Sequence, residues 1–361
     1  MRIGIALYFL MVAAYLCAFT SSTGHGSGPS LSIEALRLLD REEVLFEPSN
    51  GATFIDSGKF SDVYAGTYNG TDVVVKVLKQ PISAAKVSRE IRILEQCCDI
   101  EGVIELLGVI NEAKEQDDSL VALVFESVGK HHQWLSHRGW TPSKKQPSER
   151  DRMSSKDMTP NEVKMYIYKV LLCVQSLHRR GIMHRDIKPR NIIIDRLTRR
   201  LKIIDFGHAE VVMCGKQYST RIASRHYKAP ELLLNYVCYD SAVDIWACGC
   251  VLAGLIFRLE PFFYARPDPL NLKQLGSVCR TVGSDAVLDY CAKYGIRITE
   301  KMRRAIGHYR AVPLESFRSD DNTADDMAVD LCRGMLCVDH QERLTVEDAL
   351  AHPYFDECRE E

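Results

Sequence analysis

The segment HRDIKPRNIIID (residues 184–195) places a carboxylate, a cation and a carboxamide close together, as Asp186, Lys188 and Asn191. A second carboxylate, Asp205, follows in a DFG triplet. Asp186 can accept the proton of an incoming hydroxyl group, and a base positioned in this way contributes on the order of 10²–10⁴-fold to a reaction rate. Asn191 and Asp205 offer oxygen ligands, which suit Mg²⁺. These residue types therefore indicate a reaction centre in which a general base lies beside a magnesium ion.

Two charged residues lie upstream of this segment, in elements of different type. Lys76 belongs to the β-rich run DVVVKVLK, which follows the pair Asn69-Gly70, a strong hairpin signal. Glu90 belongs to AAKVSREIRILEQC, whose apolar residues recur at helical spacing. Glu90 is the candidate anion that aims the Lys76 ammonium group. The alternative is that Glu90 is a surface acid in a helix.

The remaining elements predict the fold class. Residues 53–79 read as three strands, and LVALVFE reads as a buried strand. The segment TPNEVKMYIYKVLLCVQSLHRRG reads as a helix that is capped at Thr159 and ended by Gly181. DIWACGCVLAGLIF is apolar on all sides, which is typical of a core helix. Because strands come first and helices later, the sequence predicts an α+β fold with two lobes.

Composition limits the choice of partners. The chain has 361 residues, and its 46 Lys and Arg against 48 Asp and Glu leave a net charge of −2. The overall charge gives no reason to expect binding to nucleic acid, so we expect no nucleic-acid partner. Residues 131–158 are polar and highly charged and contain two prolines, which indicates a surface insertion.

The N-terminus and the cysteines point to different compartments. Residues 1–22 read as a secretory signal peptide or anchor, because Arg2 is followed by 17 uncharged residues and then by small polar ones. The thirteen cysteines are irregularly spaced and do not resemble the disulfide framework of a secreted protein. The leader predicts the secretory pathway, and the nucleus or cytosol is the alternative.

Four motifs, VVVKVLK, HRDIKPRN, DFG and APE, occur in this order and together resemble the protein-kinase signature. The resemblance implies a bilobal protein kinase fold, with a small β-rich N-lobe and a larger, mainly helical C-lobe. It implies transfer of a phosphoryl group, which needs alignment and positive charge more than covalent chemistry. It implies ATP and Mg²⁺ as cofactors, catalytic roles for Asp186, Lys188, Lys76 and Glu90, and metal binding by Asn191 and Asp205.

The loop that covers the phosphates departs from the family pattern. The pattern G-x-G-x-x-G reads DSGKFS here, so that only Gly58 is retained and Asp56 comes first. An acid at this point could repel phosphate, which leaves a nucleotide-impaired scaffold as the alternative to an active enzyme. The resemblance assigns ATP binding to Gly58, Val63, Lys76, Phe125, Glu126 and Val128.

Longer segments are similar to the catalytic (alpha) subunit of casein kinase II, among them GKFSDVYAG, RIASRHYKAPELL and DHQERLTVEDALAHPYF. The similarity covers about residues 53–356. It predicts an N-lobe at 53–127 and a C-lobe at 128–356, between an N-terminal extension at 23–52 and a tail at 357–361. It implies a Ser/Thr kinase that uses ATP or GTP and prefers acidic sites, with acidic Ser/Thr proteins as substrates and a regulatory beta-type subunit as a partner.

The resemblance also assigns roles outside the catalytic set. It gives recognition of the substrate's acidic residue to three cations, Arg221, Arg225 and Lys228. An Arg side chain presents a planar fork that matches a carboxylate or a phosphate. The alternative is that these cations pair internally, with Glu210 or with a phosphate on Ser219 or Thr220. The resemblance also implies two structural contacts. Asp244 anchors the catalytic loop, and Glu231 forms an ion pair with Arg343.

Some features differ from casein kinase II. Phe206 replaces the Trp of the family's Asp-Trp-Gly, and the helix that bears Glu90 carries fewer lysines. Residues 31–52 do not match the N-terminal segment that braces the active conformation in that family. Without the brace, phosphorylation of the loop at Tyr218, Ser219 or Thr220 could be required. A proline-directed kinase of the same group is a further alternative.

Overall fold

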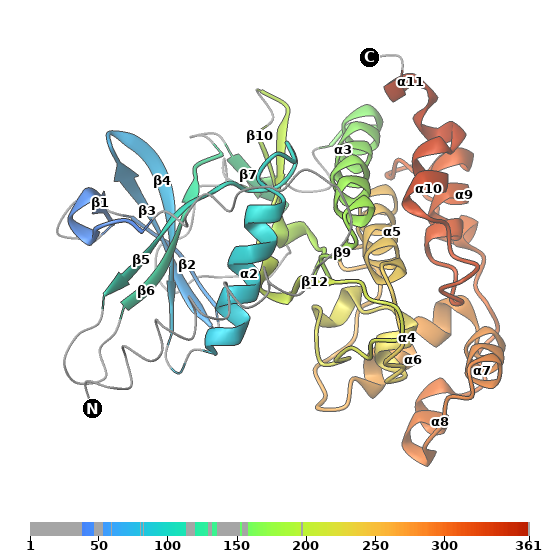
Figure 1. Ribbon diagram of the computed structural model, residues 1–361. Coiled ribbons are helices and arrows are strands. Elements are labelled where there is room, and N and C mark those ends of the chain that lie inside the picture. The colour runs from blue at the N-terminus through green and yellow to red at the C-terminus, as the bar shows by residue number, and fades with distance from the viewer. Residues whose placement is uncertain are drawn as a thin grey trace, which may run out of the picture. The chain divides into compact units, whose positions relative to one another are not determined.

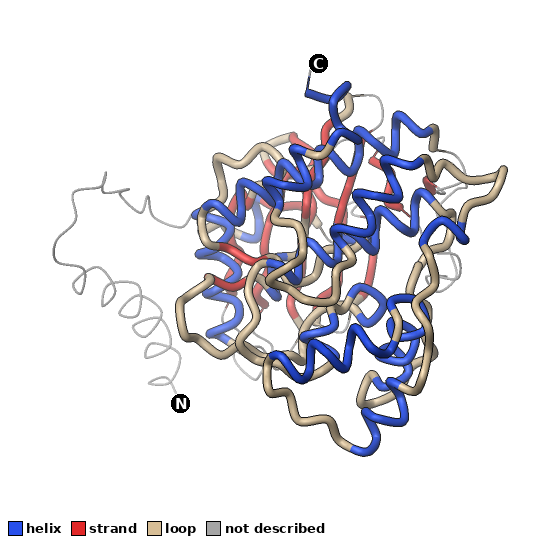
Figure 2. Tube along the Cα trace, turned by 90° about the vertical axis from the view of Figure 1, so that its right-hand side faces the viewer, coloured by secondary structure: helices blue, strands red, loops and turns tan. Residues whose placement is uncertain are grey.

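The computed structural model describes residues 38–46, 53–58, 60–79, 81, 83–112, 120–128, 132–135, 152–153, 158–195 and 198–359. The predicted leader at 1–22 lies outside these residues. The chain divides into two compact units, the first formed by Met1–Arg92 and Glu105–Ser127 and the second by Ile93–Ile104 and Val128–Glu361. Helices (blue in Figure 2) and strands (red) are both well represented, so the chain is α+β, as the sequence predicted. No helix in the described part of the chain is long and apolar enough to span a membrane.

The first unit is built on a six-stranded antiparallel sheet, in which the strand order is β1-β3-β4-β6-β5 and β2 also pairs with β3 (Figure 1). The hairpin between β3 and β4 turns at Asn69 and Gly70, whose φ angles are 49° and 74°. This is the left-handed conformation that the Asn-Gly pair predicts. The elements are β1 (Val44–Leu45), β2 (Thr53–Ser57), β3 (Ser61–Tyr68), β4 (Thr71–Leu78), β5 (Leu106–Glu112), β6 (Leu120–Glu126), the 3₁₀ helix η1 (Arg41–Glu43) and the helix α2 (Ala84–Gln96) as far as Arg92.

Part of the predicted N-terminal extension belongs to this unit. β1 pairs with β3, and Val44 lies opposite Tyr68. The side chains of Leu39, Val44 and Phe46 are buried in the core of the unit, among residues such as Val75. The unit therefore begins before residue 53, because these apolar side chains are removed from water by joining the sheet.

The second unit is mainly helical. Its first long helix, α3, is fixed at Thr159 by a capping box with Glu162 and is followed by Gly181 in the left-handed region. The next long helix, α5, is buried along almost its whole length and packs against α3 and α9, as Figure 1 also shows. The helices are α3 (Pro160–Arg179), α4 (Pro230–Leu233), α5 (Ala242–Ile256), α6 (Leu272–Val282), α7 (Ser284–Lys293), α8 (Glu300–Ile306), α9 (Asp326–Met335), α10 (Val346–Ala351) and α11 (Asp356–Arg359).

Short strands and 3₁₀ helices carry the loops of the second unit. They are β7 (His132–Leu135), β8 (Arg152–Met153), β9 (Ile182–Met183), β10 (Ile192–Asp195), β11 (Arg200–Ile203), β12 (Glu210–Val211), η5 (Pro189–Asn191), η6 (Phe206–His208), η7 (Arg225–Tyr227), η8 (Leu314–Phe317) and η9 (Pro353–Phe355). β7 pairs with β10 and β8 pairs with β7. The predicted insertion at 131–158 is therefore not wholly a surface loop, because its two described strands extend a sheet.

Residues 93–104 belong to the second unit although they lie between two parts of the first. The backbone N–H of Ile203 donates to the carbonyl of Gly102 at 2.7 Å, and Arg180 forms an ion pair with Asp99. A Cβ atom on Gly102 would lie 2.6 Å from the Cβ of Cys173, so the close approach requires glycine. Cys173 is one of the twelve described cysteines, all of which are free thiols.

Candidate active site

The buried carboxylate of Asp244, in α5, holds the loop that precedes Asp186. Its Oδ2 accepts hydrogen bonds from the backbone N–H of His184 at 2.8 Å and from the His178 ring at 3.0 Å, and its Oδ1 accepts from the backbone N–H of Arg185 at 2.7 Å. Burial alone raises the pKa of Asp244, but these hydrogen bonds and the nearby imidazoles outweigh it and bring the pKa below its ordinary value. The contact that the sequence assigned to Asp244 is present in the structure.

Three donors surround the carboxylate of Asp186. Its Oδ2 accepts from the Lys188 ammonium at 2.6 Å and from the Asn191 amide at 3.1 Å. Its Oδ1 accepts from the backbone N–H of Ser224 at 2.7 Å. The hydroxyl of Ser224 also accepts from Lys188, at 2.8 Å. The structure thus brings together three of the predicted residues and adds Ser224, which sequence reasoning missed because nothing local distinguishes it from its neighbours.

His184 fixes the backbone beside Asp186. The ring Nε2 lies 3.1 Å from the carbonyl of Ile204, which can only accept, so Nε2 carries the proton. The unprotonated Nδ1 then accepts from the backbone N–H of Asp186, at 3.2 Å. The ring of Phe206 packs edge-on against the His184 ring, with centroids 4.9 Å apart, and is almost fully buried. The aromatic residue of the DFG triplet is therefore part of the packed interior of the second unit.

Asn191 and Asp205 fit the metal-binding role on chemical grounds. The Asn191 amide nitrogen donates to the backbone carbonyl of Asp186 at 2.9 Å as well as to its carboxylate. This orientation leaves the Asn191 Oδ1 as the atom able to coordinate a cation. Asp205 has left-handed backbone angles, φ 63° and ψ 71°. One carboxylate and one amide suit Mg²⁺, which usually keeps waters and binds through one or two protein groups together with phosphate oxygens.

Lys76 and Glu90 form an ion pair within the first unit. The Lys76 Nζ lies 2.7 Å from the Glu90 Oε1, and the Glu90 side chain is only 8% exposed. Glu90 is therefore a partner of Lys76 and not a surface acid. Val63, on β3, lies opposite Lys76 in the register of β3 and β4.

The other residues that the resemblance assigns to ATP binding lie at the end of β6 and in the turn after β2. Phe125 is buried at the end of β6. The backbone N–H of Glu126 donates to the carbonyl of Glu105 at 3.1 Å, and Glu126 lies opposite Val73 in the pairing of β4 with β6. Val128 is buried and follows β6 in the chain. Gly58 begins the turn between β2 and β3, where its N–H donates to the carbonyl of Ser61 at 2.8 Å.

Arg221 and Arg225 lie in the segment that contacts Asp186 through Ser224. Arg221 is exposed, and Arg225 is partly buried. The Arg225 Nε is buried and has no hydrogen-bond partner within the described ranges. Neither guanidinium forms an ion pair with any residue that the structure describes. The alternative partner, Glu210, lies 3.3 Å from Lys216 and 3.7 Å from Arg185.

Lys228 does not present its charge to the surface, in contrast to what the sequence predicted. The side chain is buried, and its ammonium donates to the carbonyls of Thr220, at 3.1 Å, and Ile222. Burial lowers the pKa of Lys228 to about 8. The reason is that the segment folds back on itself, so that Lys228 satisfies carbonyls of the turn that carries Arg221.

The loop upstream of these cations is held by Arg185 and two tyrosines. The guanidinium of Arg185 donates to the carbonyl of His208 at 2.7 Å and to the hydroxyl of Tyr239 at 3.1 Å. The buried Tyr218 hydroxyl donates to the carbonyl of Val211 at 3.0 Å and accepts from the N–H of Met213 at 2.6 Å. The loop is therefore ordered by its own contacts.

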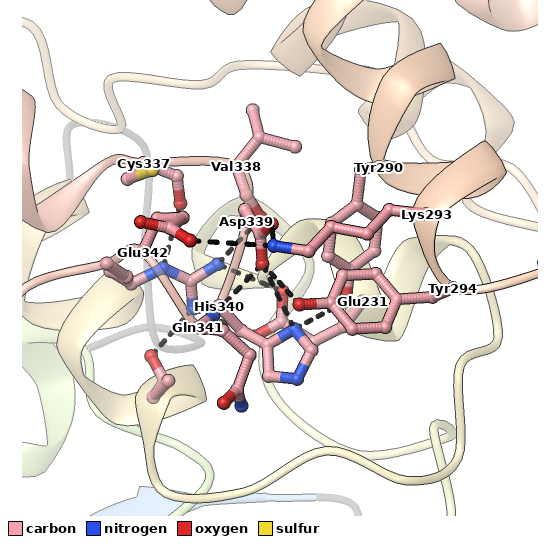
Figure 3. A network of polar contacts seen from close by, with 12 residues as sticks. Glu231, Tyr290, Lys293, Tyr294, Cys337, Val338, Asp339, His340, Gln341 and Glu342 are labelled. Atoms are coloured by element: carbon pink, nitrogen blue, oxygen red, sulfur yellow. Dashed lines mark hydrogen bonds and ion pairs between the residues drawn. The ribbon is translucent and has the colours of Figure 1, made fainter.

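The buried ion pair of Glu231 and Arg343 lies directly after the cationic segment. The guanidinium binds both carboxylate oxygens, at 2.8 and 3.1 Å, and neither side chain is exposed. Beside it, Tyr290 of α7 and Tyr294, which directly follows α7, belong to a polar network with His340 and Asp339 (Figure 3). The predicted pairing is present, and it fixes α4 to the loop that precedes α10.

Comparison with known families agrees with this geometry. The family model of the protein kinase domain matches residues 52–355. The match includes Lys76, Glu90, the loops that carry Asp186 and Asp205, and the helix that carries Glu231, and it covers most of the chain. The α+β architecture, with a β-rich first unit and a mainly helical second one, is that of the bilobal kinase fold. The chain belongs to the protein kinase family.

Proposed function

We propose that this kinase transfers the γ-phosphate of ATP to Ser and Thr hydroxyls that lie next to acidic residues, in the manner of the casein kinase II alpha subunit. One observation carries most of the proposal. The N–H of Ser224 lies 2.7 Å from the Asp186 carboxylate, and the next residue is Arg225. The candidate base, Asp186, thus contacts the residue directly before Arg225. Arg225 is a cation without an ion-pair partner among the described residues.

The residues around Asp186 would contribute to the transfer by orienting its carboxylate and by placing positive charge beside it. Ser224 and Asn191 fix the two oxygens of Asp186, so that a hydroxyl group presented to this carboxylate meets a base of defined direction. Lys188, bound to the same carboxylate, supplies positive charge near the site of transfer. Asn191 and Asp205 would hold Mg²⁺, which neutralises phosphate oxygens when it is bound with ATP.

Selectivity for acidic sites would come from Arg221 and Arg225. A hydrogen bond to a charged group is worth about 1.5–3 kcal/mol. Loss of one such contact should therefore reduce kcat/KM for an acidic peptide by about tenfold to a hundredfold. Lys228 has an indirect part in this proposal, because it shapes the turn and does not reach the substrate.

The alternative of a nucleotide-impaired scaffold rests on Asp56 and on the single glycine of the phosphate-covering loop. The ion pair between Lys76 and Glu90 and the network around Asp186 support an active enzyme. A scaffold has no need of an oriented carboxylate whose two oxygens are both held by donors. We therefore favour catalysis.

The test is a transfer assay with labelled ATP and Mg²⁺ on the full chain. Three peptides are compared, in which the Ser is followed by acidic residues, by neutral residues or by Pro. Arg221→Ala and Arg225→Ala should lose far more activity on the acidic peptide than on the neutral one, and Asp186→Asn should lose activity on both. Arg304→Ala is the matched control, because Arg304 is an exposed arginine on α8 that pairs only with Glu300 among the described residues.

Equal losses on the acidic and neutral peptides would contradict the role of the two arginines. No transfer by the parent protein would favour the scaffold. A preference for the Ser-Pro peptide would assign the chain to the proline-directed kinases.

A further inference from the structure

The turn between β2 and β3, which corresponds to the phosphate-covering loop of kinases, is not held in its conformation by glycine. Its single retained glycine, Gly58, is not in the left-handed region. A Cβ atom added there would meet only the carbonyl of Ser61, at an ordinary 3.6 Å. The turn therefore does not depend on glycine for its own conformation, and a side chain adds to the backbone hydrogen bond from Gly58 to Ser61 that closes it.

This side chain is that of Lys79, which directly follows β4. Its Nζ lies 2.8 Å from the Ser57 Oγ, 3.0 Å from the carbonyl of Gly58 and 2.8 Å from the Asp62 Oδ1. The three acceptors come from β2, from the turn and from β3. A lysine ammonium has three N–H donors, so each donor has an acceptor in this turn.

The backbone reinforces the same arrangement. The N–H of Lys79 donates to the carbonyl of Phe60 at 2.9 Å, which ties the far side of the turn to β4. Burial alone raises the pKa of Asp62, but hydrogen bonds from Lys79 and Ser57 outweigh it and lower the pKa below its ordinary value. The Asp62 carboxylate therefore stays ionised as a partner for the ammonium.

We propose that Lys79 is a positioning residue for the nucleotide phosphates, which holds the turn in place where other kinases rely on three glycines. The inference rests on the nucleotide use in the proposed function but not on the preference for acidic substrates. In kinases this loop covers the phosphates of ATP. A turn that is already closed loses less conformational freedom when the nucleotide binds, and pre-organisation of this kind increases affinity.

The geometry separates this role from a general contribution to stability. The side chains of Lys79 and Asp62 are 37% and 29% exposed, and exposed ion pairs contribute little to folding. The sheet below the turn is held by eight paired positions between β3 and β4 and by its buried core. Removal of the ammonium should free the turn without unfolding the unit.

The experiment compares Lys79→Met, Lys79→Arg and the control Lys164→Met in the full chain. Lys164 is a lysine on α3 whose ammonium lies 2.7 Å from Glu357, so its replacement also removes one surface ion pair. We measure kcat and KM for ATP at saturating peptide, the affinity for a fluorescent ADP analogue, and the midpoint of thermal unfolding.

Lys79→Met should raise KM for ATP about five- to tenfold with kcat within about twofold of the parent, as expected for the loss of uniform binding. The affinity for the ADP analogue should fall by a similar factor, Lys79→Arg should recover most of it, and Lys164→Met should match the parent. The thermal midpoint should not move in any variant.

The proposal is overturned if KM and ADP affinity do not change in Lys79→Met, or if the loss is accompanied by unfolding that Lys79→Arg does not correct. ADP binding also separates this inference from the function proposed above. If the parent binds ADP but phosphorylates no peptide, the proposed function fails while the affinities still decide the role of Lys79.

Discussion

Replacement of Glu231 by glutamine tests how the segment that carries Arg221 and Arg225 is supported. The carboxylate accepts two hydrogen bonds from Arg343, and both side chains are fully buried. Burial alone lowers the pKa of Arg343, but the charge and hydrogen bonds of Glu231 raise it above its ordinary value, so the guanidinium remains charged. Glu231→Gln keeps the shape of the side chain but leaves that charge buried without a counterion.

The expected cost follows from this burial. Breaking a buried ion pair by removing one partner costs about 3–5 kcal/mol. A domain of this size loses about 2–4 °C in its unfolding midpoint for each kcal/mol. We therefore expect the midpoint of Glu231→Gln to fall by about 10 °C in differential scanning calorimetry. Arg343 also donates to the carbonyls of Cys337, Val338 and Ala242, so activity should fall together with stability.

Arg333→Gln provides the control. Arg333 pairs with Glu315 and Asp330, but all three side chains are about half exposed. Exposed pairs contribute about 0–1 kcal/mol, so this variant should unfold close to the parent. The double variant Glu231→Leu with Arg343→Leu should lose less unfolding free energy than the two single variants lose when their losses are added. A midpoint for Glu231→Gln as close to the parent as that of Arg333→Gln would refute the reasoning.

Three further predictions concern protonation, loop order and phosphorylation. The Glu260 Oε1 is buried with no hydrogen-bond partner among the described residues, and burial raises the pKa of Glu260 from 4.5 to about 7. The folded state keeps a proton that the unfolded state releases above pH 4.5, so stability is lost as the pH rises through about 7. Glu260→Gln should therefore stabilise the protein by about 2–3 kcal/mol at pH 8 and hardly at all at pH 4. Denaturant unfolding at the two pH values measures this difference. Equal effects at both pH values would contradict this assignment. Tyr218→Phe removes two hydrogen bonds that order the loop and should lower peptide phosphorylation by about tenfold. Phosphatase treatment of the parent should leave its activity unchanged, because the Tyr218 hydroxyl is buried and Arg185 already has hydrogen-bond partners. Loss of activity after phosphatase treatment would show that phosphorylation is required.

Local sequence determined most of the elements that position the site. The Asn69-Gly70 turn, the helix α2 and the ends of α3 all follow from turn chemistry, apolar spacing and capping residues. These signals act over a few residues, so they can be read without the rest of the molecule. The candidate catalytic residues are also identifiable in this way, because their motifs combine chemistry and spacing in a fixed order.

Contacts between distant segments could not be predicted in this way. Ser224 lies 38 residues from Asp186, and nothing in its neighbours indicates that its N–H points at a carboxylate. Lys228 has the composition of a surface cation, yet the turn buries it on carbonyls of its own segment. Part of the predicted extension, including Val44, joined the sheet because a partner strand was available far along the chain.

The sequence by itself thus determined the family, the order of the lobes and the chemistry of the catalytic loop. Only the tertiary structure decided that Arg221 is exposed while Lys228 is buried, and that Lys79 holds the turn between β2 and β3. The physical reason is that the local sequence around a charged residue is the same whether its side chain faces solvent or binds the backbone of its own segment. Its role depends on which acceptors the folded chain brings within hydrogen-bond distance, as Lys79 and Lys228 show.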